Sequence, residues 1–438
     1  MADVNAASEN PQDETDRGWC LCLSGGGFRA TLFHLGVIHR LNELGILAKL
    51  STITSVSGGS ILNGVLATRW SRLKFDPETG MYTNIEEEIA KPLREFCSRD
   101  LRTEILVGTR LNPANLGVLI RDWFSVSANF LAEAYEPLFS GCHLSAILEP
   151  GLQVPRFVFC STNVRTGACW HFHGGPKGRM GDFYVGYCDA DDVRVSDAVA
   201  ASSAFPPGFS ALRLKMPPAD KITRIDPWGE DRSISTKRGE DQHGPSTNPV
   251  LLTDGGVYDN LGVEPVWNKY KTLLVSDAGR PFESVSVNRQ GILTRLKRVS
   301  EISMEQVAAV RKRWLVADFL ANKRTGAIWT LHTLLEDFDL ADASGYGVAV
   351  RKLLHRIRTD FDAFTEGEIA CLVNHGYSLA DAALRSRAKA LCPNLTSPFR
   401  WPHQGWSDEG KLHEALAASS SRKIWRDLRL YFSGWLTR

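Results

Sequence analysis

The sequence has no stretch of roughly 18 uncharged apolar residues, the length that a helix needs to cross a bilayer. The start of the chain is polar and acidic, and it lacks the basic residues and apolar run of a secretory signal. We therefore predict a disordered leader over residues 1–17 of a soluble, cytoplasmic protein. Contact with the inner face of the membrane would then be peripheral.

Cysteine pairs and excess charge are also missing. The nine cysteines are an odd number, and none of them shows the paired CxxC spacing of a zinc site or a disulfide framework. We expect them to be small buried residues in a reducing compartment, with Cys20 and Cys22 on one face of a strand. A formal charge of +1 creates no overall field toward nucleic acid, so we expect no DNA or RNA polymer as partner.

Two successive units of strand, glycine turn and helix open the chain. The apolar run 19–23 stops at Ser24 and three glycines, and apolar residues then recur at helical spacing up to residue 44. A second apolar run, 53–56, ends at a serine and two glycines, and residues 61–70 follow with helical spacing. This order predicts right-handed crossovers into a parallel sheet, with the active groups at the carboxyl ends of its strands.

The remaining pattern divides the chain near residue 280. Its 438 residues exceed what one hydrophobic core usually fills, so a second part is expected. We predict an α/β domain over residues 18–280 and a mostly helical, basic extension over 281–438. Further strands are predicted at 157–160, 168–172, 250–253, 272–275 and 328–331, a helical flank at 86–136, and a long exposed loop at 216–247.

Ser57 is the candidate nucleophile. An ester hydrolase needs its nucleophile on a sharp turn without neighbouring side chains, which is the reason for a GxSxG motif between a strand and a helix. Here the segment is Ser55-Val56-Ser57-Gly58-Gly59, with serine in place of the leading glycine. Taken alone, a serine in a glycine turn is more often structural than catalytic.

The glycines Gly25, Gly26 and Gly27 are candidates for an oxyanion hole. They leave the first strand and open a helix, so bare backbone amides lie at the positive end of a helix dipole. Arg29 follows in the first helical turn, where it could steady the loop, bind an anionic headgroup or form a salt bridge. A phosphate-binding loop is the alternative, although the segment has neither a following Gly-Lys-Ser/Thr nor a complete GxGxxG.

Asp254 is the candidate base. It directly follows the apolar run 250–253, at the carboxyl end of a predicted strand, and within reach of Ser57 it could accept the serine proton. Asp259 and Asp197 are alternative carboxylates. The chain also has eleven histidines, so a Ser-His-Asp triad is a rival to a dyad, but no histidine has a position that assigns it to the site.

Taken in order, the GGGxR loop, the SVSGG turn and the DGG aspartate resemble the motifs of the patatin-like phospholipases. Residues 200–209 are similar to the Ala/Ser/Pro block of that family, and residues 254–260 to its aspartate segment. The resemblance covers about residues 18–280. It implies a three-layer α/β/α core with a mainly parallel sheet, a dyad of Ser57 and Asp254 without histidine, hydrolysis of phospholipid acyl esters, and no metal or other cofactor.

Beyond residue 280 the chain resembles only bacterial relatives with a helical tail. Some of these look like antiphage effectors that a cyclic oligonucleotide activates, so such an activator and a homo-oligomer are two expectations that the resemblance leaves open. A degenerate scaffold or ligand-sensing protein is the alternative from another functional class. The basic residues that could bind an anion, or form a solvated helix face, are Arg295, Lys297, Arg298, Arg311, Lys312 and Arg313.

The last predicted helix has an apolar stripe with basic residues beside it. The stripe consists of Trp425, Leu428, Phe432 and Trp435. Such a helix either lies at a membrane surface or packs on the core of its domain.

Overall fold

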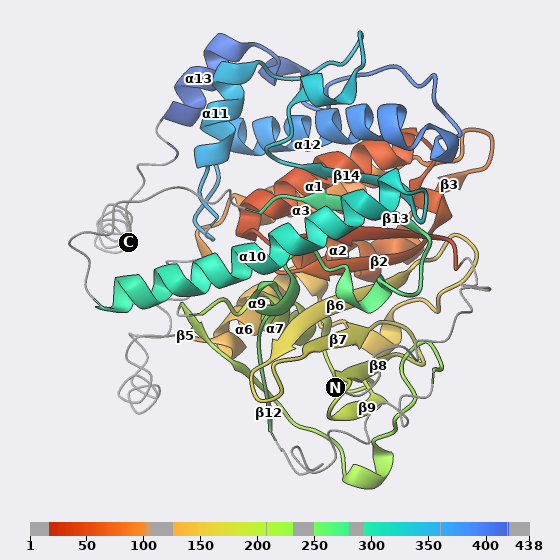
Figure 1. The fold of residues 1–438 in the computed structure, drawn as a ribbon, viewed down its shortest axis with the longest axis vertical. Helices are drawn as coiled ribbons and strands as arrows, with labels where there is room; N and C mark the ends of the chain where they lie inside the picture. Colours follow the sequence, from red (N-terminus) through yellow and green to blue (C-terminus); the bar gives the residue numbers. More distant parts are fainter. Residues whose placement is uncertain are drawn as a thin grey trace, which may run out of the picture.

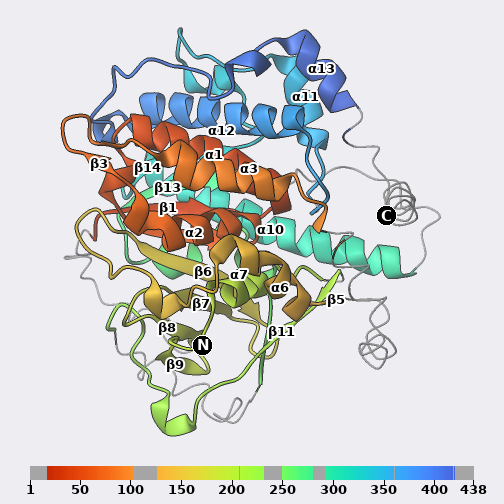
Figure 2. The ribbon, with the colours of Figure 1, turned by 180° about the vertical axis from the view of Figure 1, so that it is seen from behind.

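A ten-stranded sheet lies at the centre of the molecule, with helices on both faces (Figures 1 and 2). The computed structural model describes residues 17–101, 104, 126–206, 208–230, 249–279, 292–359, 361–417 and 419. The predicted leader, most of the loop 216–247 and the stripe 425–435 lie outside these residues. None of the described helices combines the length and the apolar character that a membrane crossing needs.

Five neighbouring strands of the sheet are parallel. In order they are β14 (Thr325–Thr330), β13 (Thr272–Asp277), β1 (Trp19–Leu23), β2 (Leu50–Val56) and β6 (Arg156–Asn163). The antiparallel strands are β7 (Cys169–His173), β8 (Arg179–Asp182), β9 (Gly186–Asp189), β11 (Leu212–Leu214) and β12 (Val250–Asp254). Each of the seven strands predicted from the sequence overlaps one of these.

Strands β2 and β12 share one edge of β6. Parallel β2 pairs with residues 156–160 of β6, and antiparallel β12 pairs with residues 161–163 beyond the end of β2. The opposite edge of β6 is occupied by β7. Because β2 and β12 run toward each other along this edge, their carboxyl ends meet there. Ser57 follows β2 and Asp254 ends β12, so the topology brings these two residues together.

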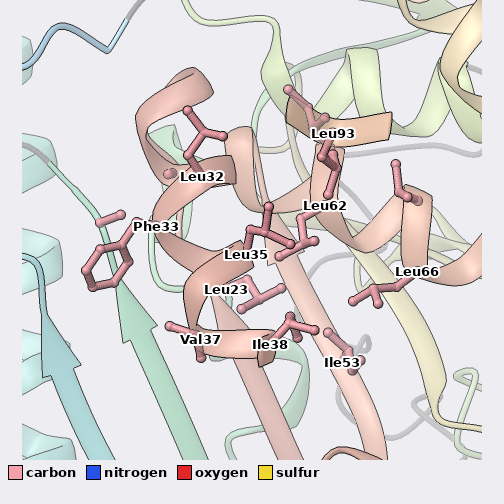
Figure 3. Close-up of a cluster of buried hydrophobic side chains, with 14 of the residues drawn as sticks. Leu23, Leu32, Phe33, Leu35, Val37, Ile38, Ile53, Leu62, Leu66 and Leu93 are labelled. Carbon is pink, nitrogen blue, oxygen red and sulfur yellow. The ribbon is translucent and has the colours of Figure 1, made fainter. Parts of the chain in front are cut away.

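Helices cover both faces of the sheet because side chains alternate along its strands. Leu21 and Leu23 of β1 belong to the larger hydrophobic cluster, whereas Cys20 and Cys22 belong to a smaller one with Leu315, which confirms the common face of the two cysteines. Figure 3 shows part of the larger cluster, where Leu23 and Ile53 from two strands lie against Leu35 and Ile38.

The helices on the face of the larger cluster include α1 (Gly27–Glu43), α2 (Gly58–Arg69), α3 (Lys91–Cys97), α6 (Ala128–Phe139), α7 (Val195–Ser203) and α12 (Glu366–Arg387). The other face is covered by α10 (Ile292–Leu320) and the short α9 (Gly256–Asp259), and α11 (Val348–Arg356) and α13 (Glu409–Ala417) lie beside α12 (Figure 1). The three-layer α/β/α architecture is therefore as predicted.

The chain beyond residue 280 joins the same core. Strand β14 pairs with β13 at the edge of the sheet, and α12 packs directly on α1. The two helices approach so closely that a Cβ on Gly36 would lie 1.9 Å from the carbonyl oxygen of Val373, and a Cβ on Gly376 1.9 Å from that of Phe33. The region is mainly helical, as predicted, but elements from both sides of residue 280 share one hydrophobic cluster.

Candidate active site

Ser57 lies on the sharp turn between β2 and α2. Its backbone has φ 49° and ψ −118°, and residues with a side chain rarely adopt a positive φ unless the surrounding structure enforces it. The turn requires glycine next to it, since a Cβ on Gly58 would lie 2.0 Å from the carbonyl oxygen of Gly27. Ser57 thus has the strained strand-to-helix geometry that exposes a nucleophile in ester hydrolases.

The glycine loop after β1 lies against this turn. A Cβ on Gly25 would lie 3.1 Å from the Ser57 Cβ atom and 2.4 Å from the Asn260 Oδ1 atom, so a side chain here would press against both. Gly26 has φ 140°, and Gly27 begins α1. The first N–H groups of a helix have no partner within the helix, and they lie at its positive end.

Gly25 differs from the other two glycines. Its N–H donates to the carbonyl oxygen of Asn260 at 3.1 Å, so this amide is already bonded. The sequence predicts an oxyanion hole that contains the amides of all three glycines. The Gly25 amide ties the loop to the segment that follows Asp254, whereas Gly26 and Gly27 lie at the start of helix α1.

Asp254 is buried next to Ser57. Its side chain is only 2% exposed, and one carboxylate oxygen accepts a hydrogen bond from the Gly256 N–H at 2.7 Å. Burial raises its pKa to about 7, although the hydrogen bonds from Gly256 and from the Ser57 side chain act in the opposite direction. A carboxylate with a pKa near neutrality, hydrogen-bonded to a serine, has the properties of a general base.

Arg29 anchors the first turn of α1, which follows the glycine loop, to two segments distant in the sequence. Its side chain is fully buried, and its guanidinium donates to the carbonyl oxygens of Ala278 at 2.8 Å and Ile357 at 3.1 Å. These contacts connect the start of α1 with the end of β13 and with the chain beyond residue 280, and the role of Arg29 in steadying the loop stays a prediction.

Ser202 in α7 also contacts the site, and the sequence motifs did not predict it. Its hydroxyl accepts a hydrogen bond from the Ser57 N–H at 2.9 Å and donates to the carbonyl oxygen of Cys160 at 2.6 Å. The backbone N–H of the nucleophile is therefore fixed by a side chain from another element. The only signal in the sequence was the position of Ser202 in the segment 200–209.

Ser55, the residue in place of the usual glycine, belongs to a chain of buried hydroxyl groups. The Ser60 hydroxyl lies 2.9 Å from the Ser202 hydroxyl and 2.9 Å from the Ser55 hydroxyl, and Asn63 donates to Ser55 at 2.9 Å. Ser55 and Ser60 are fully buried. The Ser55 side chain therefore points into this polar network, where its hydroxyl has partners, and the network reaches the Ser57 N–H through Ser202.

The alternative carboxylates have partners elsewhere. Asp259 accepts hydrogen bonds from three backbone N–H groups after α9, and Arg311 lies 3.7 Å from it. Asp197 forms an ion pair with Arg194 at 2.9 Å. Neither contact involves Ser57.

The histidines considered from the sequence also have other contacts. His34 is buried behind the glycine loop, where its ring nitrogens lie 2.8 Å from the Ser276 hydroxyl and 3.0 Å from the Ser24 carbonyl oxygen. Burial lowers its pKa to about 4. His171 and His173 lie 2.9 Å apart on β7. Among the described residues, no group of three or more His, Cys, Asp and Glu side chains is arranged to hold a metal ion.

Comparison with known proteins gives one family and several solved structures. The model of the family described as patatin-like phospholipase matches residues 21–267, which is more than half of the chain. No curated protein matches. Human GIVD cytosolic phospholipase A2 is similar over 89% of this chain and 64% of its own, with 13% identity and a TM-score of 0.47. VipD from Legionella pneumophila is similar over 92% of this chain and 74% of its own, with 15% identity and a TM-score of 0.33.

The chain thus spans less than two thirds of the human protein. The matched residues 21–267 contain the glycine loop, the Ser57 turn and Asp254, as well as Ser202.

Proposed function

The chain belongs to the patatin-like phospholipase family, and we propose that it is a lipid ester hydrolase whose reaction Ser57 and Asp254 carry out. The substrate in this proposal is a membrane phospholipid, and the bond cleaved is a fatty-acyl ester. The protein acts while bound peripherally to the membrane.

In the first step, the Ser57 hydroxyl oxygen attacks the carbonyl carbon of the ester, and Asp254 accepts the hydroxyl proton. The carbonyl oxygen becomes an oxyanion, which the N–H groups of Gly26 and Gly27 stabilise at the start of α1. Collapse of this intermediate breaks the ester bond. The leaving alcohol takes the proton from Asp254, and the acyl group stays on Ser57.

In the second step, water attacks the acyl-Ser57 carbonyl, and Asp254 accepts a proton from the water. The same two N–H groups stabilise the second oxyanion. The Ser57 oxygen leaves with the proton held by Asp254, and the fatty acid is released. The step restores the carboxylate and the free hydroxyl.

The observation that carries the proposal is the strained Ser57 turn beside a buried Asp254 whose pKa lies near neutrality. A structural serine has no need of a positive φ, and a structural aspartate is seldom left so deeply buried without a cation. Both features are costly for stability, and both are useful for catalysis.

The proposal is tested by release of fatty acid from phosphatidylcholine vesicles. We expect Ser57→Ala and Asp254→Asn each to abolish release, and Ser145→Ala, a partly exposed serine distant in sequence, to retain it. Labelling with a fluorophosphonate, which reacts with activated serines, should modify Ser57 in the wild type. A variant that lacks either dyad residue and still releases fatty acid contradicts the dyad, and an unlabelled Ser57 favours the scaffold alternative.

Activation by a cyclic oligonucleotide stays a prediction. Two of the basic residues considered for anion binding, Arg311 and Lys312, are engaged within the protein: Arg311 donates to Glu264, and Lys312 pairs with Asp277 at 2.5 Å.

A further inference from the structure

Helix α10 exposes an unusual number of apolar side chains. Seven of the fifteen exposed large apolar side chains of the described residues lie on this one helix. Leu296, Val299, Val307 and Trp314 are 58%, 59%, 38% and 60% exposed. Their spacing places them on one face of the helix, in a stripe of about 27 Å. A helix that only sealed the core would direct such a stripe inward.

The charges on the solvent side of α10 are mainly basic. Where its side chains are described, the charged residues of the exposed class are Arg295 and Arg313. The Glu301 side chain is 41% exposed but pairs with Arg298, and Asp318 pairs with Arg324. The solvent side of α10 therefore presents apolar and basic groups, and its exposed carboxylate already has a basic partner on the same helix.

The opposite side of α10 holds the helix next to the active site. Leu315 is fully buried in the smaller core cluster, and Lys312 pairs with Asp277 at the carboxyl end of β13. Arg311 donates to the carbonyl oxygen of Tyr258, four residues after Asp254. Helix α10 lies across the face of the molecule in front of the sheet, and its N-terminal end extends beyond the other helices (Figure 1).

We propose that this exposed face of α10 docks the protein on an anionic lipid bilayer. The inference rests on the proposed function, because the substrate of that reaction lies in a bilayer. An apolar stripe flanked by arginines is the pattern of a helix that lies in a membrane interface, with the apolar side chains among the acyl chains and the arginines at anionic headgroups. Arg311 ties the segment after Asp254 to the opposite side of α10, so docking brings that segment toward the bilayer with the helix between them.

The charge pattern favours a bilayer over a second copy of this chain. A two-fold contact brings the same patch of both subunits together, so arginines would approach arginines, and the exposed Glu301 already pairs with Arg298 of its own helix. An anionic bilayer supplies the opposite charge.

The proposal is tested by sedimentation with vesicles, using the full chain with Ser57→Ala so that the lipid stays intact. The vesicles contain phosphatidylcholine with or without phosphatidylglycerol. Replacing Leu296 and Trp314 together by Ser should weaken binding to both kinds of vesicle by about tenfold or more. The reason is that docking would no longer bury the apolar area of these two side chains in the bilayer. Replacing Arg295 and Arg313 by Gln should weaken only binding to the anionic vesicles, by about fivefold for each residue.

Leu152→Ser is the matched control, because Leu152 is 94% exposed and does not lie on α10. It should bind as the parent does. In the background with Ser57 restored, the α10 variants should hydrolyse a soluble short-chain ester at the wild-type rate, which shows that they are folded.

The outcomes separate docking from catalysis. If the α10 variants bind vesicles as tightly as the parent protein does, the docking proposal is overturned. It is also overturned if the parent protein binds no vesicles. A solution mass that falls in the α10 variants without lipid also overturns it, because a second copy then covers this face. The protein with Ser57 restored could hydrolyse neither the vesicle phospholipid nor the soluble ester while vesicle binding still depends on α10. That result supports docking and refutes the proposed function.

Discussion

The buried carboxyl group of Asp254 should lower the free energy of unfolding when it is ionised, and the substitution Asp254→Asn should remove this cost. Asp254→Asn keeps the size of the side chain and an oxygen that can accept the hydrogen bond from Gly256. It removes the charge, which burial disfavours. We expect the variant to lose activity and, above neutral pH, to be more stable than the wild type.

The size of the effect follows from the pKa. Folded Asp254 keeps its proton up to about pH 7, whereas the unfolded chain releases it near pH 4. A raised pKa in the folded state stabilises the protein at low pH, and this contribution is lost as the pH rises through 7. The loss is about 1.4 kcal/mol for each pH unit between the two pKa values. From about pH 5 to about pH 8 it amounts to roughly 3 kcal/mol.

The assay is urea unfolding of both proteins at these two pH values. The free energy of unfolding of Asp254→Asn, relative to the wild type, should rise by roughly 3 kcal/mol between them. All other titrating groups are common to both proteins, so their contributions cancel. Asp189→Asn replaces an exposed carboxylate at the end of β9, and its free energy of unfolding should differ from that of the wild type by the same amount at both pH values. An equally constant difference for Asp254→Asn would refute the conclusion that Asp254 is protonated below neutral pH.

Three further predictions concern the base, the turn and the core. Hydrolysis of a soluble ester should fall about tenfold per pH unit below pH 7, because Asp254 must be unprotonated; a rate that is flat from about pH 5 to pH 8 contradicts this. Ser202→Ala should lower kcat about tenfold with little change in KM, because the Ser57 N–H loses its acceptor, and Ser202→Thr should restore part of the rate. Asp381→Ala should lower the free energy of unfolding by about 3 kcal/mol in urea, since it leaves the fully buried Arg40 with only its weaker partners, whereas an unchanged value would show that the pair contributes nothing.

The local elements of the site could be predicted from the sequence because they depend on neighbouring residues. The apolar runs before Gly25 and Ser57 are strands β1 and β2, and the helical spacing after each is α1 and α2. The two motifs follow parallel strands that are hydrogen-bonded to each other, so their proximity also followed from the order of elements.

The position of Asp254 depended on more than its neighbours. Its strand β12 is antiparallel to β6 and meets β2 at the shared edge, and this pairing joins residues about a hundred positions apart. The apolar run before Asp254 predicted a strand end, but a strand carries no local mark of the partner it pairs with.

The sequence by itself determined the strands, the glycine turns and the three motifs, because alternation, helical spacing and glycine act over a few residues. Only the tertiary structure decided which groups are bonded: the Gly25 amide to Asn260, Arg29 to Ala278 and Ile357, and the Ser57 N–H to Ser202. It also decided that β14 and α12 complete the core. These contacts join segments distant in the sequence, and packing in three dimensions selects among the many partners that each polar group could have.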